Sequence, residues 1–218
     1  MRADFKASKA KKHYDDPKRN LGLFEHEYAK PVTDDTWKKI HEEATACLKN
    51  FYDSSFFKEL AADDKRTWLV IEDLEEFDFE GSKIYVKLDF ARKKGDIIEI
   101  YDWKTGKEDG DASLQMSAYA IYAMQKWNIG LSGVRTYLFN LSAPMAAAKE
   151  QPLTEASVEK AREFMRESIA GMKKLLLDVR RNIPLPRQNF KYTENTRFCD
   201  SCNFYKICEK YVQPAKIA

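Results

Sequence analysis

The segment from Ile84 to Lys107 constrains the fold of this chain more than any other, because it predicts two strands joined by a tight turn. Apolar and polar residues alternate from Ile84 to Phe90, which is the period of a strand with one buried face. Residues 92–96 are polar and contain a glycine, as tight turns do, and residues 97–103 are β-branched or aromatic. We therefore expect an antiparallel hairpin in the central sheet.

The expected hairpin brings two acids and a lysine together. A loop at residues 94–95 places Lys93 opposite Asp96 and, further out, Asp89 opposite the second strand. In this register Asp89 faces Ile100. Side chains two positions apart share a face of a strand, so Asp89, Asp102 and Lys104 should project from one side of the hairpin.

This combination of side chains has a chemical interpretation. Two neighbouring carboxylates repel unless a cation lies between them, and hard oxygen ligands select magnesium or manganese. A lysine beside such an ion can orient a water for attack on phosphorus. The alternative is an ordinary hairpin face in solvent. Burial argues against that alternative, because Asp102 lies between Tyr101 and Trp103, where an unpartnered carboxylate would be costly.

Three linked motifs resemble those of a known family. Asp89 is followed by Asp102-Trp103-Lys104-Thr105-Gly106 and then by Gln115-Met116-Ser117-Ala118-Tyr119. Their order is similar to that of the RecB-like branch of the PD-(D/E)XK nuclease superfamily, which has an Asp, a D-x-K-T-G strand end and a Q-x-x-x-Y helix. The resemblance implies an α/β, restriction-endonuclease-like core with a mixed sheet flanked by helices. It also implies a nuclease site in which Asp89, Asp102 and the Trp103 carbonyl bind Mg or Mn.

The same resemblance suggests roles for further residues. Lys104 would position the attacking water, and Gln115 and Tyr119 would face the site from one side of a helix, since they are spaced i and i+4. His41, on a helix that begins near Asp35, and Glu72, just before the hairpin, are both candidates to complete the metal shell. The alternative for His41 is a solvated helix histidine, and the alternative for Glu72 is a solvated acidic face. His26 competes with His41 as a candidate, and Glu75 and Glu76 compete with Glu72.

The elements around the hairpin agree with this fold. Residues 67–71 and 76–79 predict strands, and Asp111 can cap a helix that runs to Trp127. The next strand, residues 134–139, would pair in parallel because a helix separates it from the hairpin, which makes the sheet mixed. A long amphipathic helix is expected from Thr154 to Arg181.

Three of the four cysteines form a C-x2-C-x5-C segment: Cys199, Cys202 and Cys208. This spacing favours a metal site over disulfides, either a metal cluster or tetrahedral zinc. The iron-sulfur members of the resembled branch, AddB-type subunits and CRISPR-associated RecB-like exonucleases, end in this pattern and take a fourth ligand from far upstream. The resemblance implies a 4Fe-4S cluster with Cys47 as fourth ligand, with structural zinc as the alternative. In those relatives the upstream cysteine precedes the motif histidine, whereas Cys47 follows it, and a buried core residue is the other reading of Cys47.

Length and composition predict a single domain. The 218 residues, 44% of them hydrophobic, can form one sizeable core. We expect residues 1–20 to be a flexible basic arm and residues 21–218 one nuclease domain, with residues 84–119 as its catalytic core and residues 187–218 as its iron-sulfur segment. The chain has no membrane-spanning run and no signal peptide, so a cytoplasmic location is expected. A net charge of +2 neither demands nor excludes nucleic acid as a partner.

The function implied is that of a metal-dependent DNA exonuclease that hydrolyses phosphodiester bonds at single-stranded ends. Repair, recombination and CRISPR adaptation, with protein partners in such a complex, are the settings that the resemblance suggests. No glycine-rich phosphate loop is visible, so a built-in helicase motor is not expected. The alternative is a non-catalytic iron-sulfur DNA-binding or assembly subunit, and the presence of Asp89, Asp102 and Lys104 argues against it.

Overall fold

A computed structural model describes residues 2–106, 112–143 and 147–208 of the chain. The chain divides into two compact units. One comprises residues 39–182 and contains the sheet and the expected hairpin. The other combines residues 1–38 with residues 183–218, so the two ends of the chain belong to one unit.

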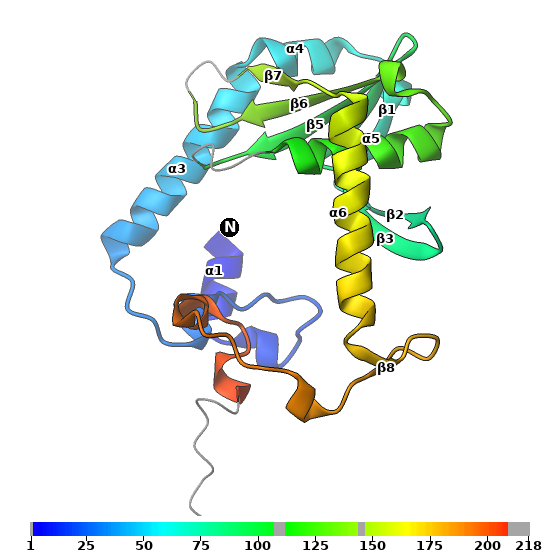
Figure 1. Cartoon of the computed structure of the whole chain (residues 1–218). Coiled ribbons are helices and arrows are strands. Elements are labelled where there is room, and N and C mark those ends of the chain that lie inside the picture. The colour runs from blue at the N-terminus through cyan, green and yellow to red at the C-terminus, as the bar shows by residue number, and fades with distance from the viewer. Residues whose placement is uncertain (1, 107–111, 144–146, 209–218) are drawn as a thin grey trace, which may run out of the picture. The chain divides into compact units, whose positions relative to one another are not determined.

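The larger unit is organised on a five-stranded mixed sheet with the order β1-β4-β5-β6-β7 (Figure 1). Only the β5–β6 pair is parallel in this sheet, and helix α5 connects its two strands. The expectation of a mixed sheet created by a helical crossover is therefore confirmed. The strands are β1 (Trp68–Ile71), β4 (Phe90–Lys94), β5 (Ile97–Lys104), β6 (Val134–Asn140) and β7 (Ala148–Gln151).

The expected strand from Ile84 to Phe90 is two strands in the structure. β3 (Ser82–Lys87) pairs with β2 (Leu74–Phe79) as a separate two-stranded sheet, and β4 begins only at Phe90. The break falls at Leu88 and Asp89, where the chain passes from the small sheet to the large one. Alternation alone could not reveal the break, because the even-numbered residues Val86, Leu88 and Phe90 are all buried, although Phe90 lies in the other hydrophobic cluster.

The register of the β4–β5 hairpin also differs from the expected one. The loop is Gly95-Asp96, because Gly95 takes the positive φ (+62°) of the first turn position, and Lys93 pairs with Ile98 instead of Asp96. Asp89 then lies one step beyond the Phe90–Tyr101 pair, opposite Asp102 instead of Ile100. A shift of two residues keeps every side chain on its expected face, so the predicted grouping of the acids is unaffected.

Helices cover both faces of the sheet. α5 (Ser113–Trp127) and α6 (Glu155–Lys173) pack together on one side, and α4 (Ser55–Ala62) packs on the other. The helical segment that follows Thr33 is divided at Ser54, which ends α3 (Asp34–Asp53) and caps α4 by accepting a hydrogen bond from Phe57 N at 3.0 Å. α6 begins after Thr154, with a Thr154–Ser157 capping box, but it ends at Lys173 and does not reach the expected Arg181. β8 (Leu176–Asp178) follows it.

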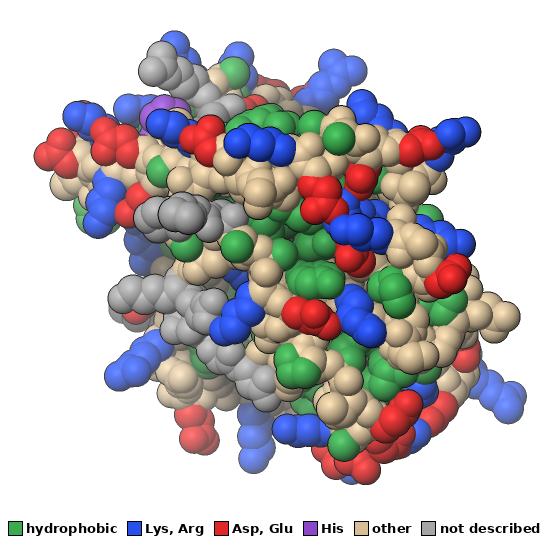
Figure 2. All heavy atoms as spheres, turned by 90° about the horizontal axis from the view of Figure 1, so that it is seen from above, with side chains coloured by type: hydrophobic (Ala, Val, Ile, Leu, Met, Phe, Trp, Pro, Cys, Tyr) green, Lys and Arg blue, Asp and Glu red, His purple; other side chains and the backbone are tan. Residues whose placement is uncertain are grey.

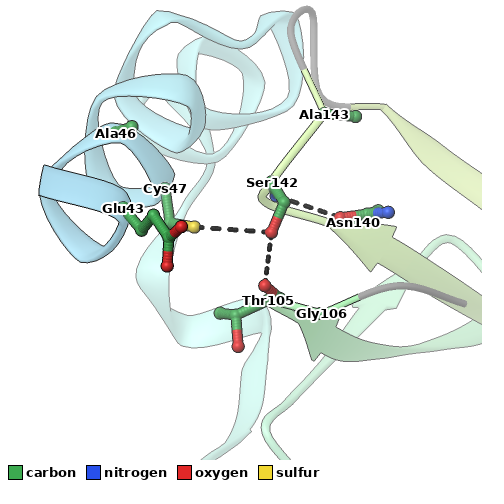
Figure 3. Close-up of a pocket in the computed structure, with 8 residues that line it drawn as sticks. All are labelled: Glu43, Ala46, Cys47, Thr105, Gly106, Asn140, Ser142 and Ala143. Carbon is green, nitrogen blue, oxygen red and sulfur yellow. Dashed lines mark hydrogen bonds between the residues drawn. The ribbon is translucent and has the colours of Figure 1, made fainter. Parts of the chain in front are cut away.

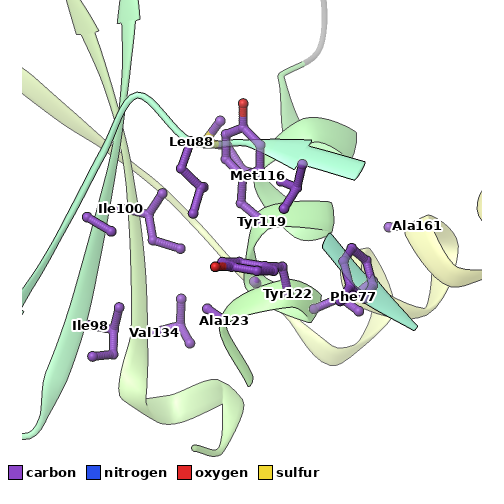
Figure 4. Close-up of a cluster of buried hydrophobic side chains, with 14 of the residues drawn as sticks. Phe77, Leu88, Ile98, Ile100, Met116, Tyr119, Tyr122, Ala123, Val134 and Ala161 are labelled. Carbon is purple, nitrogen blue, oxygen red and sulfur yellow. The ribbon is translucent and has the colours of Figure 1, made fainter. Parts of the chain in front are cut away.

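The core has one hydrophobic cluster on each side of the sheet. Ile98 and Ile100 of β5 pack against α5 in the larger cluster, which also receives Phe77 from the small hairpin (Figure 4). Tyr101 lies on the opposite face, where it packs with Phe56 of α4. β5 is therefore buried on both sides, and a polar side chain on it needs a partner or a function.

A buried arginine joins α4 to the sheet. Arg92 is 2% exposed and donates to Glu59 at 2.7 Å, Asp63 at 2.5 Å and Glu99 at 2.8 Å. Burial lowers the pKa of Arg92, but the hydrogen bonds that Arg92 donates to the surrounding carboxylates raise it, and the net effect is a raised pKa. The guanidinium thus compensates Glu99, which is itself buried next to Tyr101.

The smaller unit is built from short elements at both ends of the chain. Residues 2–20, expected as an arm, contain α1 (Arg2–Lys9), in which Ser8 is buried and accepts a hydrogen bond from Leu23 N at 2.7 Å. Tyr28 donates to the carbonyl of Asn203 at 2.5 Å, which joins the two ends of the chain. Its other elements are η1 (Lys12–Tyr14), α2 (Phe24–Glu27), β9 (Ile183–Pro184), η4 (Arg187–Asn189), η5 (Thr196–Ser201) and η6 (Tyr205–Ile207). Across the described parts of the chain, no helix is long and apolar enough to cross a membrane.

The Arg92 cluster predicts a large stability effect. Replacing Arg92 with Met should lower the free energy of unfolding by about 3 kcal/mol, because Glu99 would stay buried without its cation. The matched control Arg135→Met removes a half-exposed ion pair with Glu150 and should cost about 1 kcal/mol or less. Urea unfolding followed by circular dichroism measures both values. Equal losses in the two variants would show that the buried cluster has no special weight.

Candidate active site

Asp89 lies in the bend between β3 and β4, and its side chain binds the central strand. Its Oδ2 accepts a hydrogen bond from the backbone N–H of Trp103 at 2.7 Å. This contact ties the bend to the end of β5 and leaves Oδ1 for another partner. The carboxylate of Asp89 is thereby held beside the residues on either side of Trp103.

Asp102 is buried, with 3% of its surface exposed. Its Oδ1 accepts a hydrogen bond from the Tyr119 hydroxyl at 3.3 Å, and Lys104 Nζ lies 2.6 Å from its Oδ2. No hydrogen bond to Oδ2 is formed in the described part of the chain, but the ammonium of Lys104 forms an ion pair with it. The buried carboxylate is thus compensated by one cation, and its remaining lone pairs can still coordinate another.

A chain of hydrogen bonds connects the hairpin to α5. Lys104 Nζ donates to Gln115 Oε1 at 3.1 Å, and Gln115 Nε2 donates to the Tyr119 hydroxyl at 2.8 Å. The same hydroxyl lies 3.2 Å from the carbonyl of Lys87, on β3. The i, i+4 spacing thus places Gln115 and Tyr119 against Lys104 and Asp102, and Figure 4 shows the Tyr119 hydroxyl pointing out of the hydrophobic cluster.

The electrostatics of the site reflect its burial. Burial raises the pKa of Asp89, and the negative charges of Asp102 and Glu72 act in the same direction against the hydrogen bond from Trp103. Burial and the charge of Asp102 also raise the pKa of Tyr119, so its hydroxyl stays protonated as a donor. Two carboxylates held this close without a cation repel each other, and a bound cation would relieve that repulsion.

The donor set fits a hard divalent cation. Asp89 and Asp102 supply carboxylate oxygens at one end of β5, and Lys104 Nζ lies 2.6 Å from Oδ2 of Asp102. Within residues 2–106, 112–143 and 147–208, no three His, Cys, Asp or Glu side chains are gathered as a complete metal site. The cation would therefore depend on these two carboxylates together with backbone carbonyls, substrate oxygens or water.

The two candidates for completing the metal shell differ in position. Glu72 N donates to the carbonyl of Asp89 at 3.0 Å, so Glu72 lies next to the site, but its carboxylate binds Lys87 at 2.8 Å. His41 is exposed on α3, and the described hydrogen bonds of the two aspartates do not include it. Lys87, which sequence reasoning had not selected, contacts both Glu72 and Tyr119. Its position two residues before Asp89 was the available signal.

The cysteines belong to different units. Cys199, Cys202 and Cys208 lie in or beside the turns η5 and η6, and all three side chains are half-buried. Cys47 is buried in the unit of residues 39–182, where its Sγ lies 3.7 Å from Ser142 Oγ. In the described residues the predicted cysteine-ligated cluster is not assembled as a metal-binding group.

A pocket of about 510 Å³ adjoins the strand ends that carry the site (Figure 3). Thr105 and Gly106, which follow Lys104, line it together with Asn140, the β6 partner of Lys104. Ser142 Oγ donates to the carbonyl of Thr105, which fixes the two chain segments after β5 and β6 to each other. The expected helix cap Asp111 and the loop before it lie outside the described residues.

The surface charge is mixed. On the face drawn in Figure 2, basic and acidic side chains are interspersed and hydrophobic patches lie between them. This pattern agrees with the net charge of +2. Long-range attraction of a polyanion is therefore weak on this face, and local contacts must supply most of the recognition of a substrate.

Two solved structures resemble this chain at low sequence identity. A protein from Eubacterium rectale named "Putative exonuclease" shares 12% identity with this chain at a TM-score of 0.42, covering 89% of this chain and 74% of that one. A protein named SSO0001 shares 15% identity at a TM-score of 0.36, with 87% and 93% of the two chains covered. No curated protein matches the chain in sequence.

A family model gives the decisive comparison. The model of the PD-(D/E)XK nuclease superfamily matches residues 3–209, which include Asp89, the Asp102–Lys104 strand end and the helix with Gln115 and Tyr119. The mixed sheet flanked by helices agrees with a restriction-endonuclease-like fold. Since the match spans nearly the whole chain, the protein belongs to the PD-(D/E)XK nuclease superfamily.

Proposed function

We propose that this protein is a Mg- or Mn-dependent deoxyribonuclease that degrades DNA from single-stranded ends. The observation that carries the proposal is the grouping of the buried Asp102, the half-buried Asp89 and Lys104 at one end of β5, with Lys104 Nζ 2.6 Å from Asp102 Oδ2. Two carboxylates and a lysine held this close together are typical of a metal-dependent functional site. The preference for DNA with single-stranded ends rests on the resemblance of the motifs.

In this proposal the aspartates hold the cation and the lysine acts on the reacting groups. When bound, the metal ion would lower the pKa of a water and neutralise charge on the phosphate. Lys104 Nζ has three N–H donors, one of which binds Gln115, so others can bind the attacking water or a phosphate oxygen. Gln115 and Tyr119 keep Lys104 and Asp102 in position through their own hydrogen bonds.

A non-catalytic DNA-binding or assembly subunit is the alternative function. Such a subunit would keep the fold for structural reasons and would not need two carboxylates and a lysine grouped at one strand end. The contacts of Asp102 and Lys104 therefore favour the enzyme. Repair, recombination and CRISPR adaptation are the processes in which a DNA exonuclease of this kind would act with partner proteins.

We further propose that Cys199, Cys202 and Cys208 bind a 4Fe-4S cluster, with zinc as the alternative metal. All three lie in one short segment of turns, and thiolates are suitable ligands for either metal. Lys206, between two of these cysteines, binds Glu27 of α2 in the same unit. The cysteine segment is thus attached to the N-terminal residues by contacts that need no metal.

The enzyme proposal predicts a large loss of activity in two variants. Lys104→Ala and Asp102→Asn should each reduce the rate of DNA degradation by about 100-fold or more, because each removes a group that stabilises the transition state. End-labelled single- and double-stranded DNA, incubated with Mg²⁺ or Mn²⁺, gives the rate and the polarity. Lys126→Ala is the matched control. It removes an α5 lysine that pairs with Glu75 of β2, and it should retain the wild-type rate. If the wild type and both variants are equally inactive, the assembly subunit is the better interpretation.

The raised pKa of Asp89 predicts how stability responds to pH and metal. The pKa of Asp89 is higher in the folded state than its unfolded value of about 3.9, so between these two pKa values the folded state binds more protons than the unfolded state. The free energy of unfolding therefore falls as pH rises from the lower pKa to the higher one. Asp89→Asn can keep the hydrogen bond from Trp103 and should be more thermostable than the wild type at neutral pH without metal. This advantage should disappear below about pH 4.

Thermal unfolding with added Mn²⁺ supplies the second half of the Asp89 test. The wild type should gain melting temperature because Mn²⁺ binds only the folded site. Asp89→Asn should gain much less, since one carboxylate ligand is absent. The same Mn²⁺-induced shift in both proteins would show that Asp89 is not a metal ligand.

The cysteine proposal predicts the metal content of the purified protein. Wild-type protein prepared without oxygen should contain iron and absorb broadly in the visible range, whereas zinc would leave it colourless. Cys202→Ser should lose most of the metal, because it removes a thiolate ligand. The neighbouring Ser201→Ala is the control and should retain the metal, because Ser201 has no thiolate to lose. Elemental analysis gives the values, and wild-type protein that holds neither iron nor zinc would refute the assignment.

A further inference from the structure

We propose that the exposed face of the β2–β3 hairpin is a stacking platform for the unpaired end of a nucleic-acid substrate, with Tyr85 as the residue on which a base stacks. This inference rests on the nuclease function proposed above. The observations that support it are the exposure of Tyr85, its position on β3 and the contact of the Lys87 carbonyl, at the end of that strand, with Tyr119 of the candidate site. Each of these comes from residues within the unit of residues 39–182.

The hairpin has one buried and one exposed face. Phe77, Phe79 and Val86 point into the core, whereas the cross-strand neighbours on the other face point to solvent. On that face Tyr85 is 63% exposed and Leu74, diagonal to it across the strand pair, is 68% exposed. A tyrosine held by strand backbone offers a flat ring at low conformational cost, which is suitable for stacking on a base.

The exposed face leads directly into the candidate active site. Lys83, Tyr85 and Lys87 occupy alternate positions of β3, and Asp89 follows at the next alternate position. The carbonyl of Lys87 lies 3.2 Å from the Tyr119 hydroxyl, and its ammonium binds Glu72, whose N–H donates to Asp89. Tyr85 lies two residues, about 7 Å of extended strand, before Lys87, so it is within reach of nucleotides next to the scissile bond.

The charges on this face favour stacking over phosphate binding. Lys83 and Lys87 are each paired with an acid at 2.8 Å, Glu76 and Glu72 respectively, and Asp78 lies on the same face. Lys83 Nζ also lies 5.9 Å from the Tyr85 ring centroid. A surface on which acids accompany the lysines attracts a phosphate backbone weakly, so recognition must come from the ring. Ring stacking requires an unpaired base, since the bases of a duplex are covered.

Binding without metal tests the platform separately from catalysis. The probe is a single-stranded DNA oligonucleotide of about 12 nucleotides that carries 2-aminopurine, incubated with wild-type protein in EDTA. Tyr85→Ala should weaken binding about tenfold and abolish the quenching of 2-aminopurine that stacking causes. Tyr85→Phe should bind within about twofold of the wild type, because it retains the ring. Tyr52→Ala, at an α3 tyrosine that is 58% exposed, is the matched control and should bind like the wild type.

The same proteins assayed with Mn²⁺ distinguish the two proposals. If the wild type degrades the probe and Tyr85→Ala binds and degrades it equally well, the platform is refuted and the nuclease stands, which leaves this face for a protein partner. If the wild type binds through Tyr85 but degrades nothing, the nuclease is refuted and the platform stands. Wild-type protein that neither binds nor degrades the probe would overturn both.

Discussion

The hydrogen bond from the Trp103 N–H to the Asp89 carboxylate is the contact on which the rest of the site depends. It holds the bend between the two sheets against the end of β5, and so places Asp89 opposite Asp102. The chain changes from the small hairpin to the main sheet at this point. The half-buried carboxylate of Asp89 therefore serves both as a connector in the fold and as one half of the candidate metal site.

β5 is the strand through which structure and chemistry are coupled. Its odd-numbered residues Tyr101 and Trp103 pack on the α4 side, whereas Asp102 and Lys104 face α5. Arg92 anchors α4 to the same strand through Glu99. Because both faces of β5 are covered, the positions of Asp102 and Lys104 are fixed by packing, and the hydrogen bonds from Gln115 and Tyr119 need only orient their side chains.

In the proposed function, the surface next to the site would contact the substrate. The β2–β3 hairpin buries three aromatic or aliphatic side chains on one face and leaves Tyr85 and Leu74 on the other. Its strand ends next to Asp89, so a nucleic-acid strand lying on this face would reach the carboxylates. Because the net charge is only +2, long-range attraction of a nucleic acid is weak. In the proposal, base stacking on Tyr85 and local contacts bind the substrate instead.

The sequence by itself determined the mixed sheet, the shared face of Asp89, Asp102 and Lys104, and the pairing of Gln115 with Tyr119, because strand and helix periods are local properties of the chain. It could not locate the break at Leu88 or the loop at Gly95-Asp96, since a shift of two residues leaves the same alternation. Only the tertiary structure decided that Asp89 binds Trp103, that Asp102 binds Tyr119 and that Lys87 lies beside Glu72. These contacts join residues far apart in the chain, and no local pattern specifies them.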